Sequence, residues 1–531
     1  MTNNIFKRFN ITGLCNPARH YMVDTSAKIE TIIREYIEPG EYFVINRARQ
    51  YGKTTTLRLL EFALSNRYLI IRLTFEGKEG YFESRENLVN RVCAQMATFL
   101  RDTHPDFVSI ILEHSSQPDA MDDLGARITT LCQHAKTPVI LIIDEVDRAS
   151  DYAVFASFLG TLRQKYLDRS DADDRSTFHS VILAGVHDIK NLKAKIRPDS
   201  EHAYNSPWNI AAPFDVDLSF APDEITTMLT EYEADHHTDM DINVISERLH
   251  YHTSGYPFLV SLLCKYIHDD KLSWTCDGVD AAVRRALNEK NTLFDDMIKN
   301  LQNHTEFASL VKRIILEGKN VDYNPDDPNI DIGVMYGIFA RNDDLVQISN
   351  RIFSTRLMNY FISTSNTGKL AKERSERDAS LYICDGVLDF DKVIERFSVF
   401  MHDTYQDRNS AFIEREARLL LLGYIKPIIN GYGQYFLEPQ IRGGKKIDIL
   451  VQYKQEEYII EVKIWRGEAY ERRAYDQIAG YVKSRGKTIG YVINFVGADS
   501  ISARNLQKAP RQGSIFKHNG VEIHETIIAY R

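Results

Sequence analysis

The 531-residue sequence contains no apolar run approaching the roughly 20 residues that a bilayer-spanning helix needs. Its start, MTNNIFKRFNITGLC, lacks the apolar core and the cleavage site of a secretory signal. The six cysteines form no CxxC pair, and the sixteen histidines show no HExxH spacing, so neither a zinc site nor a disulfide framework is indicated. We therefore expect a cytoplasmic protein with reduced thiols and no membrane contact.

A strong excess of charge of one sign is also lacking. The chain has 65 lysines and arginines against 74 aspartates and glutamates, a net charge of −9, which excludes a generic polyanion binder. Residues 401–531 are different, with 20 basic against 15 acidic residues. This local balance indicates either a polyanion-binding module or ordinary variation in surface charge. At 44% hydrophobic and 26% charged residues, the composition is that of a globular protein.

Apolar runs separated by helical patterns organise the first part of the chain. Buried strands are predicted at 41–48, 67–75, 138–147 and 178–186. One of the intervening patterns predicts a long helix from about Arg85 to Leu112. Strands that alternate with helices favour a parallel sheet covered on both faces.

The length suggests about three or four domains. Helical patterns follow the strands, and then a strand pair runs into a helix, as in a winged-helix module. A polar, charged stretch after these elements predicts a linker. We expect an α/β domain (1–221), a helical lid with a winged-helix-like module (222–365), a linker (366–385) and a C-terminal α/β domain (386–531).

A phosphate-binding loop is predicted at NRARQYGKTT, which follows the first strand and precedes a helix. Gly52 allows close approach of the backbone, Lys53 supplies charge for the β- and γ-phosphates, and Thr54 supplies a hydroxyl for Mg²⁺. Thr55 can bind near the α-phosphate. The first glycine of GxxxxGK[ST] is absent, because position 47 is arginine.

The third predicted strand supports the same site. It ends in Asp144 and Glu145, about 90 residues after the loop. At the end of such a strand an aspartate holds Mg²⁺ through water, and a glutamate orients or deprotonates the attacking water. The two motifs together identify residues 1–221 as a P-loop NTPase domain. They predict binding of ATP with Mg²⁺ at Thr54 and Asp144, with Glu145 as a catalytic residue.

The segment ARQYGKTT resembles the loop of prokaryotic AAA-like ATPases related to the signal-transduction and archaeal ATPase group, which tolerate the missing glycine. DEVD, LAGVHDI, SPWNIAAPFDVDLSF and HTSGYPFLV resemble further blocks of that group, which together cover about 1–265. The resemblance implies a homo-oligomer and nucleotide contacts from Arg49, Gln50, Tyr51 and Pro257, the last within a glycine-x-proline motif that begins at Gly255. Arg148 and Arg197 are candidate arginine fingers, and His187 occupies a sensor-like position.

A second set of charged residues lies in the C-terminal region. Asp448 stands in KKIDILV, and Glu461 and Lys463 stand in IIEVKIW. Strand alternation places Glu461 and Lys463 on one face, and a hairpin would bring Asp448 beside them. Two carboxylates favour a hard divalent ion such as Mg²⁺, and a lysine can position the attacking water or offset developing charge.

This D-x(n)-(D/E)-x-K pattern resembles the PD-(D/E)XK nucleases, with a restriction-endonuclease-like fold. The resemblance, over about 400–500, implies a further acidic metal ligand on the preceding helix, Glu414 or alternatively Glu416. It also implies a supporting glutamine, Gln477, on the following helix. The proline of the family name is absent, since Ile447 precedes Asp448.

These patterns predict an ATPase joined to a Mg²⁺- or Mn²⁺-dependent nuclease, with catalytic residues Asp448, Glu461 and Lys463. Nucleic acid, more specifically DNA, is the expected partner, and the resemblance implies a role in prokaryotic defence or foreign-DNA processing. An alternative is a nucleotide-gated sensor or scaffold that binds nucleic acid or protein without cutting. A third interpretation is an ATPase regulator that contacts DNA through its winged helix.

Overall fold

A computed structural model gives the structure of the protein in two compact units. The first comprises residues 1–237, 255–262 and 335–337, and the second comprises residues 238–254, 263–334 and 338–531. The structure describes residues 7–114, 117–149, 153–169, 177–186, 208–317, 320–364, 382–384, 387–404, 414–429, 433–437, 448–454, 456–465, 468–497 and 514–530. The domain boundaries proposed from the sequence stay predictions.

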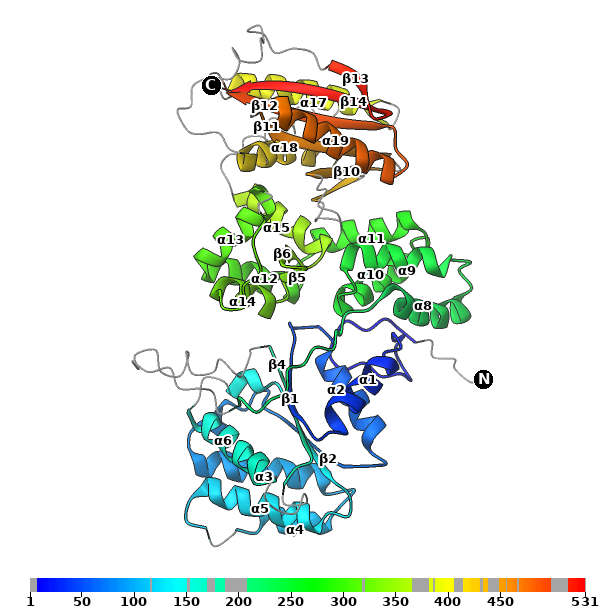
Figure 1. Ribbon diagram of the computed structural model, residues 1–531. Coiled ribbons are helices and arrows are strands. Elements are labelled where there is room, and N and C mark those ends of the chain that lie inside the picture. Colours follow the sequence, from blue (N-terminus) through cyan, green and yellow to red (C-terminus); the bar gives the residue numbers. More distant parts are fainter. Residues whose placement is uncertain are drawn as a thin grey trace. The chain divides into compact units, whose positions relative to one another are not determined.

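The first unit contains a parallel sheet in the order β1-β4-β3-β2 (Figure 1). Its strands are β1 (Tyr42–Asn46), β2 (Leu69–Thr74), β3 (Val139–Asp144) and β4 (Ser180–Gly185). The predicted four-stranded parallel sheet is therefore confirmed. Since β4 lies between β1 and β3, the carboxyl ends of these three strands meet at one edge.

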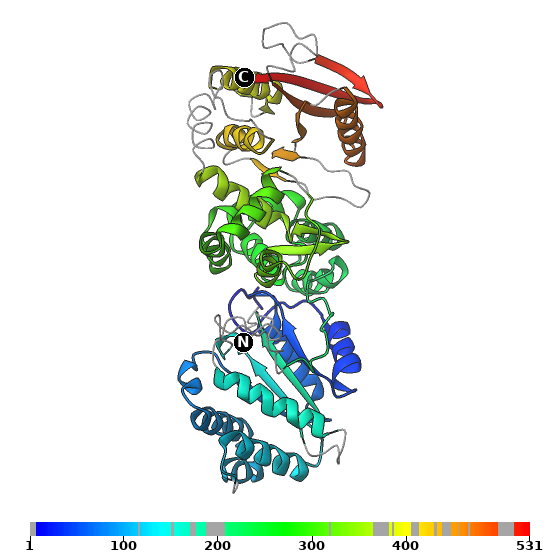
Figure 2. The same ribbon diagram turned by 60° about the vertical axis from the view of Figure 1, so that its left-hand side comes forward.

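Helices cover both faces of this sheet (Figures 1 and 2). They are α1 (Ser26–Ile32) with a π-helical extension (Ile33–Ile37), α2 (Lys53–Leu64), α3 (Arg85–Leu100), α4 (Asp106–Leu112), α5 (Ala120–His134) and α6 (Ala153–Asp168), with 3₁₀ turns at Glu79–Phe82 and Val146–Ala149. The helix α8 (Pro222–His236) follows later in the chain. Alternate residues of β1 enter opposite cores. Tyr42 packs with α3, α5 and α6, whereas Phe43 packs with α1 and α2.

The long helix predicted from Arg85 to Leu112 is wrong, because the chain forms two helices there. α3 ends at Leu100 and α4 begins at Asp106. Pro105 lies between them as the N-cap residue of α4. Proline has no backbone N–H and restricts the residue before it, so a helix that approaches it stops and a new one starts.

The second unit begins with helices, and three of them start at a typical N-cap residue. Asp241, Thr275 and Asn291 each cap a helix by accepting a backbone N–H from the first turn. The helices are α9 (Ile242–Thr253), α11 (Cys276–Asn288), α12 (Thr292–Asn303), α13 (Thr305–Glu317), α14 (Pro328–Met335) and α15 (Arg351–Thr364). The hairpin of β5 (Phe339–Asn342) and β6 (Leu345–Ile348) precedes α15, in the order expected for the winged-helix-like module.

A six-stranded mixed sheet, ordered β13-β14-β12-β11-β10-β9, forms the rest of the second unit. Its strands are β9 (Gly433–Phe436), β10 (Ile449–Tyr453), β11 (Glu456–Ile464), β12 (Ile489–Gly497), β13 (Ser514–His518) and β14 (Val521–Tyr530). The accompanying elements are α17 (Phe390–Thr404), α18 (Glu414–Ile429), α19 (Glu468–Ser484) and the short pair β7 (Ile383–Cys384) and β8 (Val387–Leu388). This mixed sheet was only partly anticipated, because β9, β13 and β14 were not predicted.

Two helices pack against opposite faces of this sheet. On one face, Ile478 and Val482 of α19 join a core with Ile459 and Val492. On the other, Phe390 of α17 stacks on a tyrosine of β11. None of the described helices combines the length and apolar character needed to cross a membrane.

Gly255 provides a test of the packing in the first unit. It has φ +71°, and a Cβ there would lie 2.1 Å from the carbonyl oxygen of Phe220. We expect Gly255→Ala to cost roughly 3 kcal/mol, which lowers the thermal midpoint by about 5–10 °C. Gly77, with φ +64° and open space around it, is the matched control. Gly77→Ala should cost about 1 kcal/mol, and equal shifts for the two variants would contradict the steric argument.

Candidate nucleotide and metal sites

The predicted phosphate-binding loop connects β1 to α2. Gln50 (φ 58°) and Gly52 (φ 81°) are both left-handed, so the backbone curls before α2 begins at Lys53. Gly52 is the N-cap residue and has no side chain to satisfy the first N–H groups of the helix. Those groups and the positive end of the helix dipole are arranged as an anion-binding site requires.

Lys53 is buried and folded onto the loop. Its Nζ donates to the carbonyl oxygens of Arg47 at 2.9 Å and Ala48 at 3.0 Å. Burial lowers the pKa of Lys53, and the nearby carboxylates of Asp147 and Glu145 oppose that shift. An incoming polyphosphate would offer this ammonium stronger, charged acceptors than two carbonyl groups.

The two predicted Mg²⁺ ligands of this site meet directly. The hydroxyl of Thr54 donates to Oδ2 of Asp144 at 2.8 Å. The other carboxylate oxygen of Asp144 accepts the backbone N–H of Glu145 at 2.9 Å. A hydroxyl and a carboxylate brought together at the start of a helix are a donor set that Mg²⁺ takes with phosphate and water.

Glu145 has the left-handed backbone (φ 57°) that non-glycine residues rarely adopt. Such strain is concentrated at functional sites, where the surroundings hold it in place. Burial, followed by the negative charge of Asp144, raises the pKa of Glu145 above its ordinary value. A raised pKa suits a carboxylate that takes a proton from water.

Arg47, at the position of the missing glycine, connects the loop to the 214–216 segment. Its guanidinium donates to the carbonyl oxygens of Phe214 at 3.3 Å and Val216 at 2.9 Å. It also lies 5.3 Å from the centre of the Phe214 ring. These contacts hold the Arg47 side chain on the 214–216 segment. The loop therefore keeps its curled backbone although arginine replaces the usual glycine.

The glycine-x-proline motif lies against the same loop, at the start of α10 (Pro257–Asp269). The Tyr256 hydroxyl donates to the carbonyl oxygen of Arg49 at 2.6 Å, and the Tyr51 ring meets the Tyr256 ring edge-on at 4.8 Å. Pro257 Cγ lies 4.0 Å from where a Cβ of Gly52 would be. Sequence reasoning named Pro257 but missed Tyr256, although it stands inside the quoted motif.

The remaining predicted residues of this site are Thr55, His187, Arg197 and Arg148. Thr55 lies in the first turn of α2. His187 and Arg197 lie outside the described residues, as does the side chain of Arg148. Sequence reasoning also missed Asp147, whose Oδ1 accepts the backbone N–H of Val186 at 2.6 Å and so ties the end of β4 to the turn after β3.

The second set of predicted residues meets in the C-terminal sheet. The antiparallel register pairs Ile449 with Ile460, which sets Asp448 opposite Glu461. Lys463 Nζ lies 2.7 Å from Oε1 of Glu461 and 3.6 Å from Oδ2 of Asp448. We call Asp448, Glu461 and Lys463 the acid–lysine cluster.

The acid–lysine cluster is almost sealed from solvent. Asp448 is 8% exposed and Glu461 is 0% exposed. Burial and then the charge of Asp448 raise the pKa of Glu461 to about 8. Burial also opposes ionisation of Asp448, but Arg418 and Lys463 outweigh it and hold the pKa of Asp448 below its ordinary value. Among the described residues, Glu461 Oε2 has no hydrogen-bond donor.

Arg418 of α18 adds a second cation that sequence reasoning missed. Its guanidinium forms an ion pair with Oδ1 of Asp448. Oδ2 of Asp448 accepts the backbone N–H of Val462 at 2.7 Å. Position in the sequence gave no signal for Arg418, since it precedes Asp448 by 30 residues.

The remaining predicted residues of the C-terminal site are Glu414, Glu416 and Gln477. The side chains of Glu414 and Glu416 lie outside the described residues, although α18 begins at Glu414. Gln477 is half-buried on α19, and no hydrogen bond links it to the cluster within the described part of the chain. Those same described residues contain no group of three histidine, cysteine, aspartate or glutamate side chains arranged to hold a metal ion.

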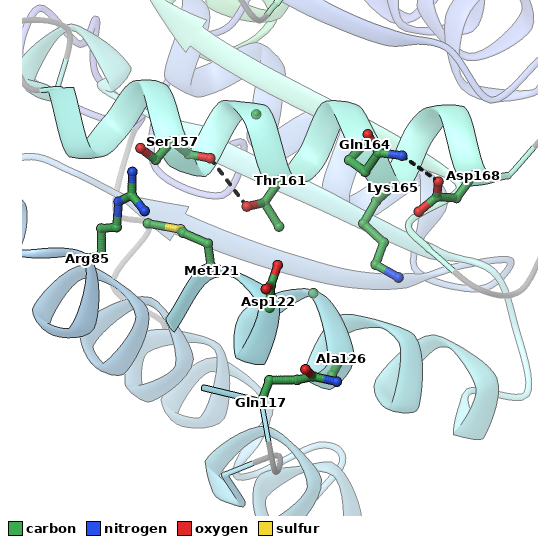
Figure 3. A pocket seen from close by; sticks show the side chains of 12 residues that line it. Arg85, Gln117, Met121, Asp122, Ala126, Ser157, Thr161, Gln164, Lys165 and Asp168 are labelled. Carbon is green, nitrogen blue, oxygen red and sulfur yellow. Dashed lines mark hydrogen bonds between the residues drawn. The ribbon is translucent and has the colours of Figure 1, made fainter. Parts of the chain in front are cut away.

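A separate polar pocket of about 590 Å³ lies between α5 and α6 (Figure 3). Basic and acidic side chains line it, including Arg85, Asp122, Lys165 and Asp168. Gln164 donates to Asp168 at 2.7 Å across one turn of α6. None of its lining residues belongs to the predicted nucleotide or metal sites.

Comparisons with solved structures find similar chains in archaea. A Walker-type ATPase of Pyrococcus abyssi is 14% identical, with a TM-score of 0.44, covering 66% of this chain and 99% of its own. The ORC2 protein of Aeropyrum pernix is 13% identical, with a TM-score of 0.40, covering 67% and 96%. The ORC1 protein of Aeropyrum pernix, in complex with DNA, is 11% identical, with a TM-score of 0.29, covering 64% and 93%.

A search of curated proteins finds no match. The family comparison matches residues 13–359 to the AAA-like domain, a segment that contains the loop, both strand-end acids and the glycine-x-proline motif. The match spans more than half of the sequence, and the sheet and loop have the P-loop form expected from the sequence. The chain therefore belongs to the AAA-like domain family of P-loop ATPases.

Proposed function

We propose that this protein hydrolyses ATP in its first unit and cleaves nucleic-acid phosphodiesters with the acid–lysine cluster, using Mg²⁺ or Mn²⁺. The observation that carries the nuclease proposal is the meeting of Asp448, Glu461 and Lys463 in a buried setting. A like-charged pair of buried carboxylates is unfavourable unless a cation or a proton compensates it. We propose DNA as the substrate and further copies of the chain as partners.

At the nucleotide site, Lys53 and the N–H groups at the start of α2 would hold the phosphates. Thr54 and Asp144 would hold Mg²⁺, which polarises the phosphates and offsets their charge. Glu145 would orient the attacking water and accept its proton, because its position follows directly on Asp144 and its pKa is raised. Arg49, Gln50, Tyr51 and Thr55 would shape the rest of the pocket.

The residues of the C-terminal site fit a divalent ion. Glu461 Oε2 is buried without a hydrogen-bond donor among the described residues, and a hard cation prefers carboxylate oxygens. Asp448 and Glu461 would be the ligands, and Glu414 would add an acid from the start of α18. The ion would activate water and neutralise the phosphate.

Lys463 completes the proposed chemistry. Its ammonium lies between both carboxylates, 2.7 Å from Glu461 and 3.6 Å from Asp448. From there it would hold the attacking water and stabilise negative charge on the phosphorane. Gln477, on the following helix, would support the substrate from the side of α19.

A second candidate is favoured by the Arg418–Asp448 ion pair. Arg418 already compensates one carboxylate, so the C-terminal domain could bind nucleic acid or protein without cutting. This nucleotide-gated sensor or scaffold would bind polynucleotides in a manner that depends on ATP. It differs from the nuclease in showing no cleavage that depends on Asp448.

Glu145→Gln tests the ATPase assignment. We expect ATP binding to be kept and the rate of phosphate release to fall at least about 100-fold, because the amide cannot accept the proton. Binding is measured with a fluorescent ATP analogue, and turnover by phosphate release. The exposed Glu76, whose charge acts on Glu145, gives the control variant Glu76→Gln, which should keep most of the activity. Comparable losses in both variants would argue against a proton-accepting role for Glu145.

Tyr256→Phe tests whether the hydroxyl supports the nucleotide loop. Removing it leaves the Arg49 carbonyl without its donor, and a hydrogen bond of this kind contributes about 0.5–1.5 kcal/mol. We expect the Kd for ATP to rise about two- to tenfold. Tyr266→Phe removes another hydroxyl of α10, one bonded to Glu289, and should leave the Kd unchanged. An unchanged Kd in Tyr256→Phe would show that the loop does not need this bond.

The nuclease proposal is tested by cleavage of single- and double-stranded DNA and RNA with Mg²⁺ or Mn²⁺. We expect Asp448→Asn to lose at least about 100-fold in rate, since it removes a charged ligand without changing shape. Asp476→Asn, at an exposed position of α19, is the matched control and should cleave normally. Lys53→Ala, assayed with and without ATP, reports whether nucleotide gates cleavage.

Three outcomes separate the proposals. Cleavage that is lost only in Asp448→Asn supports the nuclease. No cleavage in any variant, together with ATP turnover and ATP-dependent polynucleotide binding, overturns the nuclease in favour of the sensor or scaffold. DNA binding that survives removal of residues 386–531 would instead point to the regulator that uses its winged helix.

A further inference from the structure

Arg418 connects the acid–lysine cluster to α13, a helix of the region that precedes the C-terminal sheet in the chain. Its side chain is 5% exposed, and its guanidinium contacts two groups from different parts of the second unit. One nitrogen pairs with Oδ1 of Asp448, and another donates to the carbonyl oxygen of Leu316 at 3.2 Å. Leu316 lies in the last turn of α13 (Thr305–Glu317), within the helical region.

The carbonyl of Leu316 is a favourable place for an arginine. The last four carbonyl groups of a helix have no partner inside that helix, and the helix dipole makes this end negative. A buried guanidinium can therefore bridge the end of α13 to a carboxylate with both groups satisfied. α13 also packs against α18, the helix that carries Arg418.

This bridge uses the oxygen that a metal ion would need. Oδ2 of Asp448 accepts the Val462 backbone N–H at 2.7 Å and has Lys463 3.6 Å away, whereas the partner of Oδ1 is a side chain from another helix that can change its position. Arg418 holds Oδ1 in the structure. A divalent ion would be a third cation beside this carboxylate, after Arg418 and Lys463, and little water is present to screen their repulsion. A divalent ion and Arg418 are consequently alternatives at Oδ1.

We propose that Arg418 is a clamp that competes with a divalent cation for Asp448 and that α13 holds the clamp in place. The proposal rests on the proposed metal-dependent function of the acid–lysine cluster and adds its regulation. Movement of α13 that withdraws Arg418 frees Asp448 for the metal. The helical region thereby controls the metal affinity of the C-terminal domain.

The test measures Mn²⁺ binding to the full chain without nucleotide, from the electron paramagnetic resonance signal of free Mn²⁺. All proteins carry Asp144→Asn, which removes a metal ligand of the nucleotide site. We expect Arg418→Met to bind Mn²⁺ at least about tenfold more tightly than the parent, because the competing charge is gone. A thermal unfolding scan of each variant reports whether it is folded.

Two further variants control for charge and packing. Arg418→Lys keeps a charge near Asp448 but lacks the second nitrogen that reaches Leu316, so its affinity should lie between those of the parent and Arg418→Met. Arg356 of α15 is also partly buried and donates to a helix-end carbonyl, that of Leu287, yet has no carboxylate partner among its described contacts. Arg356→Met should leave Mn²⁺ affinity unchanged.

Each outcome decides a different part of the proposal. If adding Asp448→Asn to Arg418→Met leaves Mn²⁺ binding as tight as in Arg418→Met alone, the cluster is not the metal site, and both the proposed function and the clamp are wrong. If the site exists but a folded Arg418→Met binds no more tightly, the clamp alone is wrong. If Arg418→Lys binds Mn²⁺ with the affinity of the parent, the contact with α13 plays no part in the competition. If Arg418→Met does not fold, the competition is tested by whether Arg418→Lys binds Mn²⁺ more tightly than the parent.

Discussion

Burial of charge is the constraint on which the second unit depends. In the C-terminal sheet, the register sets Asp448 opposite Glu461 where water has little access. Like charges at this distance cannot both stay ionised without compensation, and the structure provides it through Lys463 and Arg418. Burial and the charge of Asp448 still raise the pKa of Glu461 above its ordinary value. A divalent cation would lower the free-energy cost of burying the two carboxylates, which is the physical reason for proposing one at this site.

The same constraint links the helices of the second unit to its sheet. Asp280 of α11 is 1% exposed and accepts hydrogen bonds from Arg248 and His252 of α9. It also accepts a bond from Gln452 of β10 at 2.8 Å. Burial lowers the pKa of His252 to about 4, so the imidazole is neutral at pH 7 and Arg248 is the cation that balances Asp280. Because Asp448 immediately precedes β10, this network and the acid–lysine cluster are attached to the same strand.

The sequence predicted the elements whose signal is local. Apolar runs followed by glycine, lysine or paired acids located the four parallel strands, the loop, and the threonine and aspartate that are predicted to bind Mg²⁺. A local signal was also overlooked: Asn519-Gly520, both with positive φ, forms the two-residue turn between β13 and β14, as this pair does in many hairpins. Pro105 was a second such signal, and reading it would have divided the helix that was expected to be continuous.

The sequence could not predict contacts that depend on tertiary packing. Arg418 looks like any helical arginine until α13 and β10 are brought to its two ends, 102 residues before it and 30 after it. Tyr256 reaches a loop 207 residues away. In each case an aromatic hydroxyl or a guanidinium satisfies a backbone carbonyl that neither pattern nor propensity marks. Motifs therefore identify the groups that are proposed to perform chemistry, whereas the groups that contact and position them are found only in the folded chain.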